Sequence, residues 1–177
     1  MAKVYGLKQC YVPVRETYSQ TIISYSMTPE PDGVHATWHE VYFNKKEVQK
    51  PSLAQIKEAV IADINRRTDE KIVRGMVWTA QSGGDPIPVW LSTENQFNFK
   101  SAYDLAVQKQ GATLPVTFKM GEKDGGTPIY HTFETMEDAD DFYLHAVSHI
   151  NTCLSAGWAE KDGIDWAPYE DYFKTEA

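Results

Sequence analysis

The residues with the clearest chemical potential lie on the last predicted helix. They are spaced three, four and four residues apart: Asp138, Asp141, His145 and His149. This spacing places them on one face of an α-helix, where carboxylate and imidazole groups could bind zinc or iron. Apolar residues occupy roughly the opposite face, which makes the His/Asp row the solvated side of an amphipathic helix. We therefore predict no metal site, and His145, His149 and Asp141 are the residues that would form one.

Other arrangements give no catalytic pattern. The acidic residues within 134–141 are typical of a helix start, where the helix dipole stabilises them, and their spacing does not match a calcium-binding EF-hand loop. His35 and His39 share one face of a predicted strand, whereas Glu40 lies on the other. The sequence has no GxSxG elbow, and the Gly83-Gly84 loop lacks the lysine of a phosphate-binding loop. We predict a protein that is not an enzyme and carries no cofactor.

Aromatic residues offer a binding function as an alternative to core packing. The chain has 5 tryptophans and 10 tyrosines, and Trp78 and Trp90 flank the glycine loop. Large aromatic side chains usually fill a core, but exposed ones stack on sugars or line protein interfaces. The candidate binding residues are Trp38, Trp78 and Trp90. A carbohydrate platform requires at least two of them to face solvent in one plane.

The first part of the chain is predicted to be β-rich. Two strands are predicted there, a short edge strand at Tyr11–Val14 and a longer one at 34–43. A cluster of proline and glycine at 28–33 lies between them, and the two strands could pair as a hairpin. A capping box of Ser52 and Gln55 then predicts a helix that ends at about residue 67. Apolar residues at helical spacing support it: Leu53, Ile56, Val60 and Ile64.

The rest of the chain alternates between strands and helices. Strands are predicted within 69–79, 87–91, 113–119 and 127–133, with Asp124-Gly125 as a hairpin turn. Helices are predicted at 93–109, where Thr93 and Gln96 form a capping box, and at about 135–159, where Thr135 is the cap. Gln96 could cap its own helix or bond to the backbone of the preceding strand at Trp90-Leu91.

These elements predict an α+β fold. It consists of three helices and a small, mostly antiparallel sheet that combines strands of the arm with those within 70–133. The long C-terminal helix (about 135–159) packs on the sheet to bury its apolar stripe. The predicted domain organisation is a β-rich N-terminal arm at 1–50, an α+β domain at 51–166 and an acidic aromatic tail at 167–177.

Charge and hydropathy exclude two classes of partner. The net charge is −8, which disfavours binding to nucleic acid through its phosphates. Residues 134–177 hold 2 basic and 11 acidic side chains, so the acidity is concentrated in the last predicted helix and the tail. No apolar run approaches the roughly 18 residues of a membrane helix, and the first residues lack a secretory signal core. We predict no membrane association and a cytoplasmic or virion-associated location.

Three segments resemble a domain family of unknown function that occurs in phage and prophage proteins, often near tail and tail-fibre genes. They are 63–75, 89–98 and the helix end at 154–158, and the most specific piece is Leu91-Ser-Thr-Glu-Asn-Gln96. The resemblance covers about residues 51–166. It implies a phage-derived structural or assembly-associated protein. No catalytic residue is established for the family, so none is carried over.

The leading hypothesis is therefore a non-enzymatic interaction module of phage or prophage origin. Its partner would be a protein, such as a tail or fibre component, or a second copy in a homo-oligomer. This hypothesis predicts an exposed apolar patch or an unpaired strand edge. The alternatives are a carbohydrate-binding module that uses exposed Trp and Tyr residues and, behind it, a metal-dependent hydrolase built on the His145/His149 row.

Overall fold

The α+β class predicted from the sequence is confirmed. The computed structural model describes residues 2–81, 83–123 and 125–174, and it contains α-helices and antiparallel sheets. The chain forms two compact units: unit 1 comprises Met1–Arg67 and Gly157–Ala177, and unit 2 comprises Thr68–Ala156. The predicted arm and the predicted tail both fall within unit 1.

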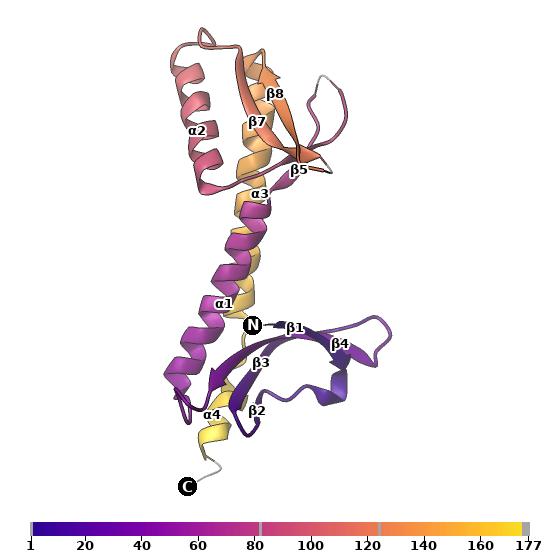
Figure 1. The fold of residues 1–177 in the computed structure, drawn as a ribbon, viewed down its shortest axis with the longest axis vertical. Coiled ribbons are helices and arrows are strands. Elements are labelled where there is room, and N and C mark those ends of the chain that lie inside the picture. The colour runs from indigo at the N-terminus through magenta and orange to yellow at the C-terminus, as the bar shows by residue number, and fades with distance from the viewer. Residues whose placement is uncertain (1, 82, 124, 175–177) are drawn as a thin grey trace. The chain divides into compact units, whose positions relative to one another are not determined.

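Figure 1 labels most of the elements in chain order. The helices are α1 (Leu53–Arg74), α2 (Thr93–Gln108), α3 (Met136–Asp162) and α4 (Ala167–Lys174), with a short 3-10 turn, η1 (Lys8–Cys10). The strands of unit 1 are β1 (Ala2–Leu7), β2 (Val14–Glu16), β3 (Gln20–Pro29) and β4 (His35–Asn44). Those of unit 2 are β5 (Met76–Trp78), β6 (Ile87–Val89), β7 (Val116–Lys123) and β8 (Thr127–Phe133). α4 occupies most of the segment predicted as a tail.

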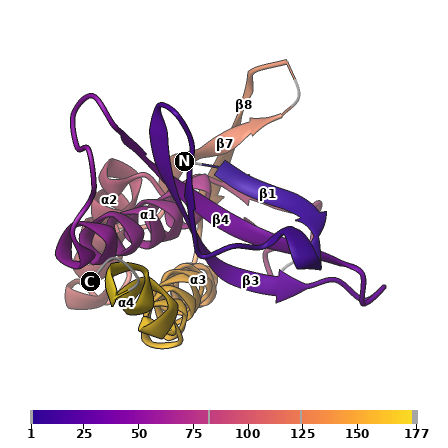
Figure 2. The same ribbon diagram turned by 90° about the horizontal axis from the view of Figure 1, so that it is seen from below.

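Unit 1 is built on a four-stranded antiparallel sheet with the order β1-β4-β3-β2. Figure 2 shows β1, β4 and β3 side by side, with β1 at the outer edge. A hairpin forms around the Pro/Gly turn, where the Asp32 carboxylate accepts hydrogen bonds from the backbone N–H groups of Val34 and His35. The predicted pairing of 11–14 with 34–43 is wrong: β4 pairs with β3, which the sequence did not predict, and Val14 pairs with β3 on its other side. The apolar face of the sheet forms a core with α1 and α4: Ile23, Tyr25, Val41, Ile56, Val60, Ile64 and Tyr169.

The expectation of one sheet that combines the arm with the later strands is wrong. The strands of unit 2 form two separate ladders, β5-β6 and β7-β8. A hydrogen bond from Trp90 N to Met120 O (2.8 Å) connects the end of the first ladder to the second. Gly121 allows this approach, because a Cβ at that position would lie 2.5 Å from Pro88 O.

α1 begins as predicted but is longer. Ser52 N donates to Gln55 Oε1 (2.8 Å) and Gln55 N donates to Ser52 Oγ (3.3 Å), which is the predicted capping box. The helix continues to Arg74, so only Met76–Trp78 of the strand predicted within 69–79 is extended. Thr68 and Ile72 are buried and continue the four-residue spacing of the apolar stripe, and this burial outweighs the β propensity of the segment.

Gly75 terminates α1 and fits its position more tightly than other glycines. Its φ is +83°, and a Cβ there would lie 1.7 Å from Val89 O. We expect Gly75→Ala to lower the free energy of unfolding by about 2–3 kcal/mol, measured by urea denaturation. Gly33→Ala is the matched control, because Gly33 also has a positive φ (+71°) but has no atom within 4 Å of an added Cβ. Equal losses in the two variants would contradict a steric role for Gly75.

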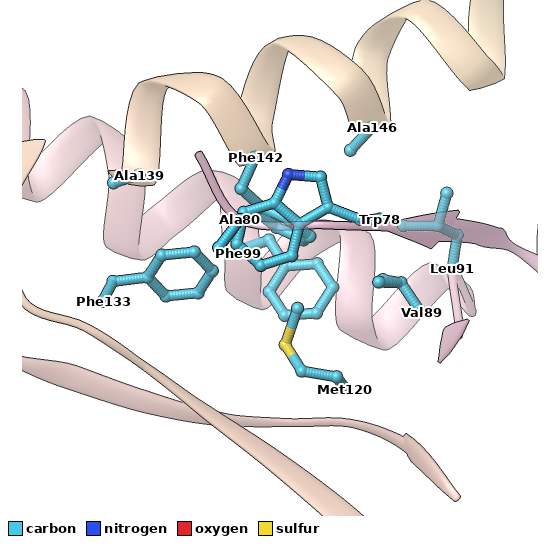
Figure 3. Close-up of a cluster of buried hydrophobic side chains, with 10 residues drawn as sticks. All are labelled: Trp78, Ala80, Val89, Leu91, Phe99, Met120, Phe133, Ala139, Phe142 and Ala146. Carbon is cyan, nitrogen blue, oxygen red and sulfur yellow. The ribbon is translucent and has the colours of Figure 1, made fainter. Parts of the chain in front are cut away.

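The core of unit 2 lies between the strands, α2 and α3 (Figure 3). It contains an aromatic cluster in which Trp78, Phe99 and Phe133 contact Phe142, with ring centroids 5.0–5.2 Å apart. Ala139, Phe142 and Ala146 are the buried residues that α3 contributes to this cluster. The predicted packing of the long helix against the strands is therefore present in unit 2.

α2 and α3 begin close to the capping residues that the sequence predicts. Ser92, rather than Thr93, is the N-cap of α2, and its side chain accepts a hydrogen bond from Asn95 N. Gln96 Nε2 donates to Leu91 O (2.7 Å), which is the second of the two roles considered for this residue. Thr135 Oγ1 caps α3 by accepting from Asp138 N (3.2 Å). The predicted turn at Asp124-Gly125 includes a position outside the described residues.

Candidate functional site

The three candidate tryptophans do not form a platform. Trp38 and Trp78 are 5% and 2% exposed, whereas Trp90 is 40% exposed. Two solvent-facing, coplanar rings were the geometric requirement for carbohydrate binding by this set. This requirement is not met, because Trp38 and Trp78 are buried within the protein.

Trp38 packs on the face of the unit 1 sheet that is opposite to its core with α1 and α4. Its Nε1 donates to Glu40 Oε1 (3.0 Å), and the hydroxyl of Tyr42 donates to Glu40 Oε2 (2.8 Å). Tyr11 contacts the indole edge-on, with ring centroids 5.9 Å apart, and Gly6 leaves room for its outer edge. The buried Glu40 carboxylate is therefore paired with the indole rather than presented to a ligand.

Trp78 pairs with one of the proposed metal ligands. Its Nε1 donates to Asp141 Oδ2 (2.8 Å), and Gln81 Nε2 donates to Asp141 Oδ1 (2.8 Å). The hydrogen bond from Trp78 is the main reason that the pKa of Asp141 lies below its usual value. Asp141 is buried, so its predicted place on the solvated side of the helix is wrong. The sequence spacing alone could not show the indole partner, which lies on a distant strand.

Within the His/Asp row only His145 and Asp141 contact each other, and Asp138 and His149 have partners elsewhere among the described residues. Asp138 Oδ2 pairs with His131 Nε2 from β8 (2.8 Å), and His145 Nδ1 donates to the backbone oxygen of Asp141 (2.8 Å). His149 Nε2 lies 3.7 Å from Cys153 Sγ. Across the described ranges, no group of three or more His, Cys, Asp or Glu residues is placed to hold a metal ion.

A polar hollow of about 430 Å³ lies beside the His131–Asp138 pair. Side chains and backbone from the end of β8 and the start of α3 line it, together with Gln81: His131, Thr132, Glu134, Thr135, Glu137 and Asp138. The Asp138 oxygen that does not bond to His131 is buried and accepts no hydrogen bond from the described residues. The pair joins β8 to α3 at the wall of the hollow.

One exposed apolar surface of unit 2 is the outer side of its strands. We call it the Trp90 face and define it by Val77, Pro88, Trp90, Lys119 and Tyr130. Val77 is 69% exposed and Tyr130 62%. Their strand neighbours point inward: Trp78 belongs to the core, and His131 contacts the rings of Trp78 and Phe133. The period-2 alternation of a strand therefore places Val77 and Tyr130 outward.

Cross-strand pairing holds the Trp90 face together. Val77 is opposite Pro88, and Lys119 is opposite Tyr130. Lys119 Nζ lies 5.4 Å from the centre of the Trp90 ring, which links the two ladders through a cation–π contact. This surface carries aromatic and aliphatic groups with one cation. Such groups bury well against another protein. The alternation within 76–78 and 127–133 was the signal that could have identified Val77 and Tyr130.

Comparison with known proteins identifies a family. Residues 55–177 match the model of a family described as Domain of unknown function (DUF4376). No curated protein and no solved structure matches the chain. No helix in the described part of the chain is both long and apolar enough to cross a membrane. The predicted resemblance of about 51–166 to a family of unknown function is thus confirmed. The match also includes the segment predicted as a tail. The chain belongs to the DUF4376 family.

Proposed function

We propose that the chain is a non-enzymatic interaction module of phage or prophage origin, which binds a tail or fibre component through the Trp90 face. The observation that carries this proposal is the exposure of Val77, Trp90 and Tyr130 on the outer side of strands whose inner side packs the core. Adjacent exposed apolar residues on a folded domain are typical of a protein interface.

The composition of the surface favours a protein partner. Tryptophan and tyrosine are enriched among the residues that dominate binding energy at interfaces. Lys119 also forms an ion pair with Glu122 (2.6 Å), which holds its ammonium group near the rings. All five residues of the Trp90 face lie within the segment matched by the family, so this surface belongs to the part of the chain that defines the family.

The first test concerns the partner. We expect genes next to the coding gene to include tail or fibre genes, and we expect one of their purified products to bind the chain in surface plasmon resonance. Trp90→Ser combined with Tyr130→Ser should weaken that binding by at least about tenfold, the equivalent of 1.4 kcal/mol. Far-ultraviolet circular dichroism should show an unchanged fold, because both side chains are exposed.

Phe97→Ser is the matched control. Phe97 is 69% exposed, lies on α2 of the same unit and is not part of the Trp90 face. It should leave the affinity unchanged. Neighbouring genes that encode no virion component would overturn the proposed origin. A double variant that binds as tightly as the unchanged protein would overturn the proposed surface.

A further inference from the structure

A second surface lies in unit 1, at the free edge of the four-stranded sheet. In the described part of the chain, β1 pairs with β4 on one side and with no strand on the other. An edge of this kind presents backbone N–H and C=O groups that another strand can use.

The register shows which backbone groups of β1 are free. Lys8 N donates to Val34 O (2.9 Å), and this pair continues the β1–β4 register beyond Leu7 and His35. Residues of an antiparallel strand point their backbone groups alternately toward and away from the partner strand. The backbone groups of Lys3, Tyr5 and Leu7 therefore point away from β4, toward the open edge.

The same three residues present exposed side chains on one face of the sheet. Tyr5 is 63% exposed and Leu7 38%, and Lys3 is also exposed. The ring of Tyr5 stacks on His35, with centroids 5.1 Å apart and planes 12° apart, and Asp32 Oδ2 pairs with His35 Nδ1 (2.6 Å). The stack holds an aromatic surface beside the free backbone groups.

The segment that contains β1 is basic, in contrast to the whole chain. Residues 1–15 contain Lys3, Lys8 and Arg15 and no acidic residue, although the net charge of the protein is −8. Arg15 pairs with Glu40 (3.6 Å), whereas Lys3 and Lys8 form no ion pair with the described residues. An acidic group would complement these two ammonium groups.

We infer that the β1 edge is a strand-addition site for an extended peptide segment of a partner protein, with apolar side chains beside Tyr5 and Leu7 and an acidic side chain beside Lys3. Backbone hydrogen bonds to the free groups of β1 provide the affinity, and alternate side chains provide the specificity. The site lies before the family-matched segment and is independent of the Trp90 face, so neither proposal rests on the other.

Leu7 permits a clean test of the backbone contribution. Its φ is −64° and its ψ is 132°, so proline fits the backbone at this position without strain. Leu7→Pro removes the outward N–H and keeps every β1–β4 hydrogen bond, whereas Leu7→Ala removes the side chain and keeps the N–H. Lys3→Glu tests the charge.

The probe is a fluorescein-labelled peptide of about seven residues, the length of a typical strand, with threonine at odd positions, valine at the second and fourth and glutamate at the sixth. Fluorescence anisotropy should show saturable binding to the full chain. Leu7→Pro should weaken it at least tenfold and Leu7→Ala no more than threefold. Lys3→Glu should reverse the preference for this peptide over one with lysine in place of glutamate.

Three outcomes would overturn the inference. One is no binding of the peptide at millimolar protein, and another is equal affinity for Leu7→Pro and the unchanged protein. The third is a concentration-dependent dimer in light scattering that Leu7→Pro abolishes, because a second copy would then occupy the edge. Trp90→Ser combined with Tyr130→Ser should leave peptide binding unchanged, which separates this result from the test of the Trp90 face.

Discussion

Replacing Asp63 with alanine should lower the free energy of unfolding by about 3–5 kcal/mol, the cost of removing one partner from a buried ion pair. Asp63 lies on α1 and is 1% exposed. Its carboxylate accepts hydrogen bonds from the hydroxyl of Tyr25, from Arg66 Nη2 (2.7 Å) and from Arg67 Nε (3.0 Å). Without it, a buried hydroxyl and a largely buried guanidinium lose their acceptor.

A second carboxylate beside Arg67 limits the loss of unfolding free energy in Asp63→Ala. Arg67 Nη2 also donates to Glu160 Oε1 (2.6 Å), so one carboxylate remains beside the guanidinium in the variant. Asp63→Asn keeps the shape of the side chain and removes its charge, and it should be less destabilising than Asp63→Ala. Asp69→Ala is the control, because Asp69 is an exposed carboxylate on the same helix. Guanidinium denaturation at pH 7 measures all three variants.

The loss in Asp63→Ala should also depend on pH. Burial raises the pKa of Asp63, but the hydrogen bonds from Tyr25, Arg66 and Arg67 outweigh it, and the pKa lies below its usual value. A carboxylate with a lowered pKa stabilises the fold above its unfolded pKa of about 3.9, and this contribution disappears as the pH falls through the folded pKa. The difference between Asp63→Ala and the unchanged protein should therefore shrink below about pH 4. A difference that stays constant between pH 7 and pH 3 would contradict an ionised Asp63.

Replacing Trp78 with alanine should also cost about 3–5 kcal/mol, the range for truncation of a buried tryptophan. Trp78 is 2% exposed and contacts His131, Phe133 and Phe142 through its ring. Its indole nitrogen, blue in Figure 3, also supplies the hydrogen bond to Asp141. Differential scanning calorimetry should show a lower melting temperature.

Trp78→Phe separates the two contributions of the indole. It retains an aromatic ring and removes the N–H, so Asp141 keeps only the hydrogen bond from Gln81 among its two side-chain donors. We expect a loss of about 1–3 kcal/mol, the cost of an unsatisfied buried partner. Because the indole hydrogen bond lowers the pKa of Asp141, the variant should raise that pKa toward its usual value.

Asp141→Asn completes a double-mutant cycle with Trp78→Phe. The two substitutions should be less than additive, because they remove the same charge-assisted hydrogen bond. Trp90→Phe is the control for loss of an indole N–H, since Trp90 is exposed. Additive losses would show that Trp78 and Asp141 stabilise the fold independently.

Local signals predict well where the helices begin. The reciprocal hydrogen bonds of Ser52 and Gln55 involve residues three positions apart, so sequence spacing specifies them. The Thr135 cap has the same local origin. The end of α1 was missed for a physical reason: Ile72 and Val73 favour a strand by composition, but Ile72 is buried as part of the helical stripe.

The candidate site depended on contacts that spacing cannot reveal. Asp141 was placed on the solvated side because its helical neighbours are polar, yet its indole partner lies 63 residues earlier in the chain. The burial of Trp38 likewise depends on Tyr11, which precedes it on a different segment. Hydropathy along one helix or strand therefore predicted the elements better than it predicted which polar groups they bury.

The boundary of the family match has a consequence for this protein. The match begins at residue 55, whereas the sheet that covers the first half of α1 is formed by β1 to β4. A chain that started at residue 55 would expose an apolar stripe on α1 and the ring of Tyr169. The part of this chain that matches the family therefore depends on residues outside the match to cover its apolar stripe, because an exposed stripe of this kind favours binding to another surface.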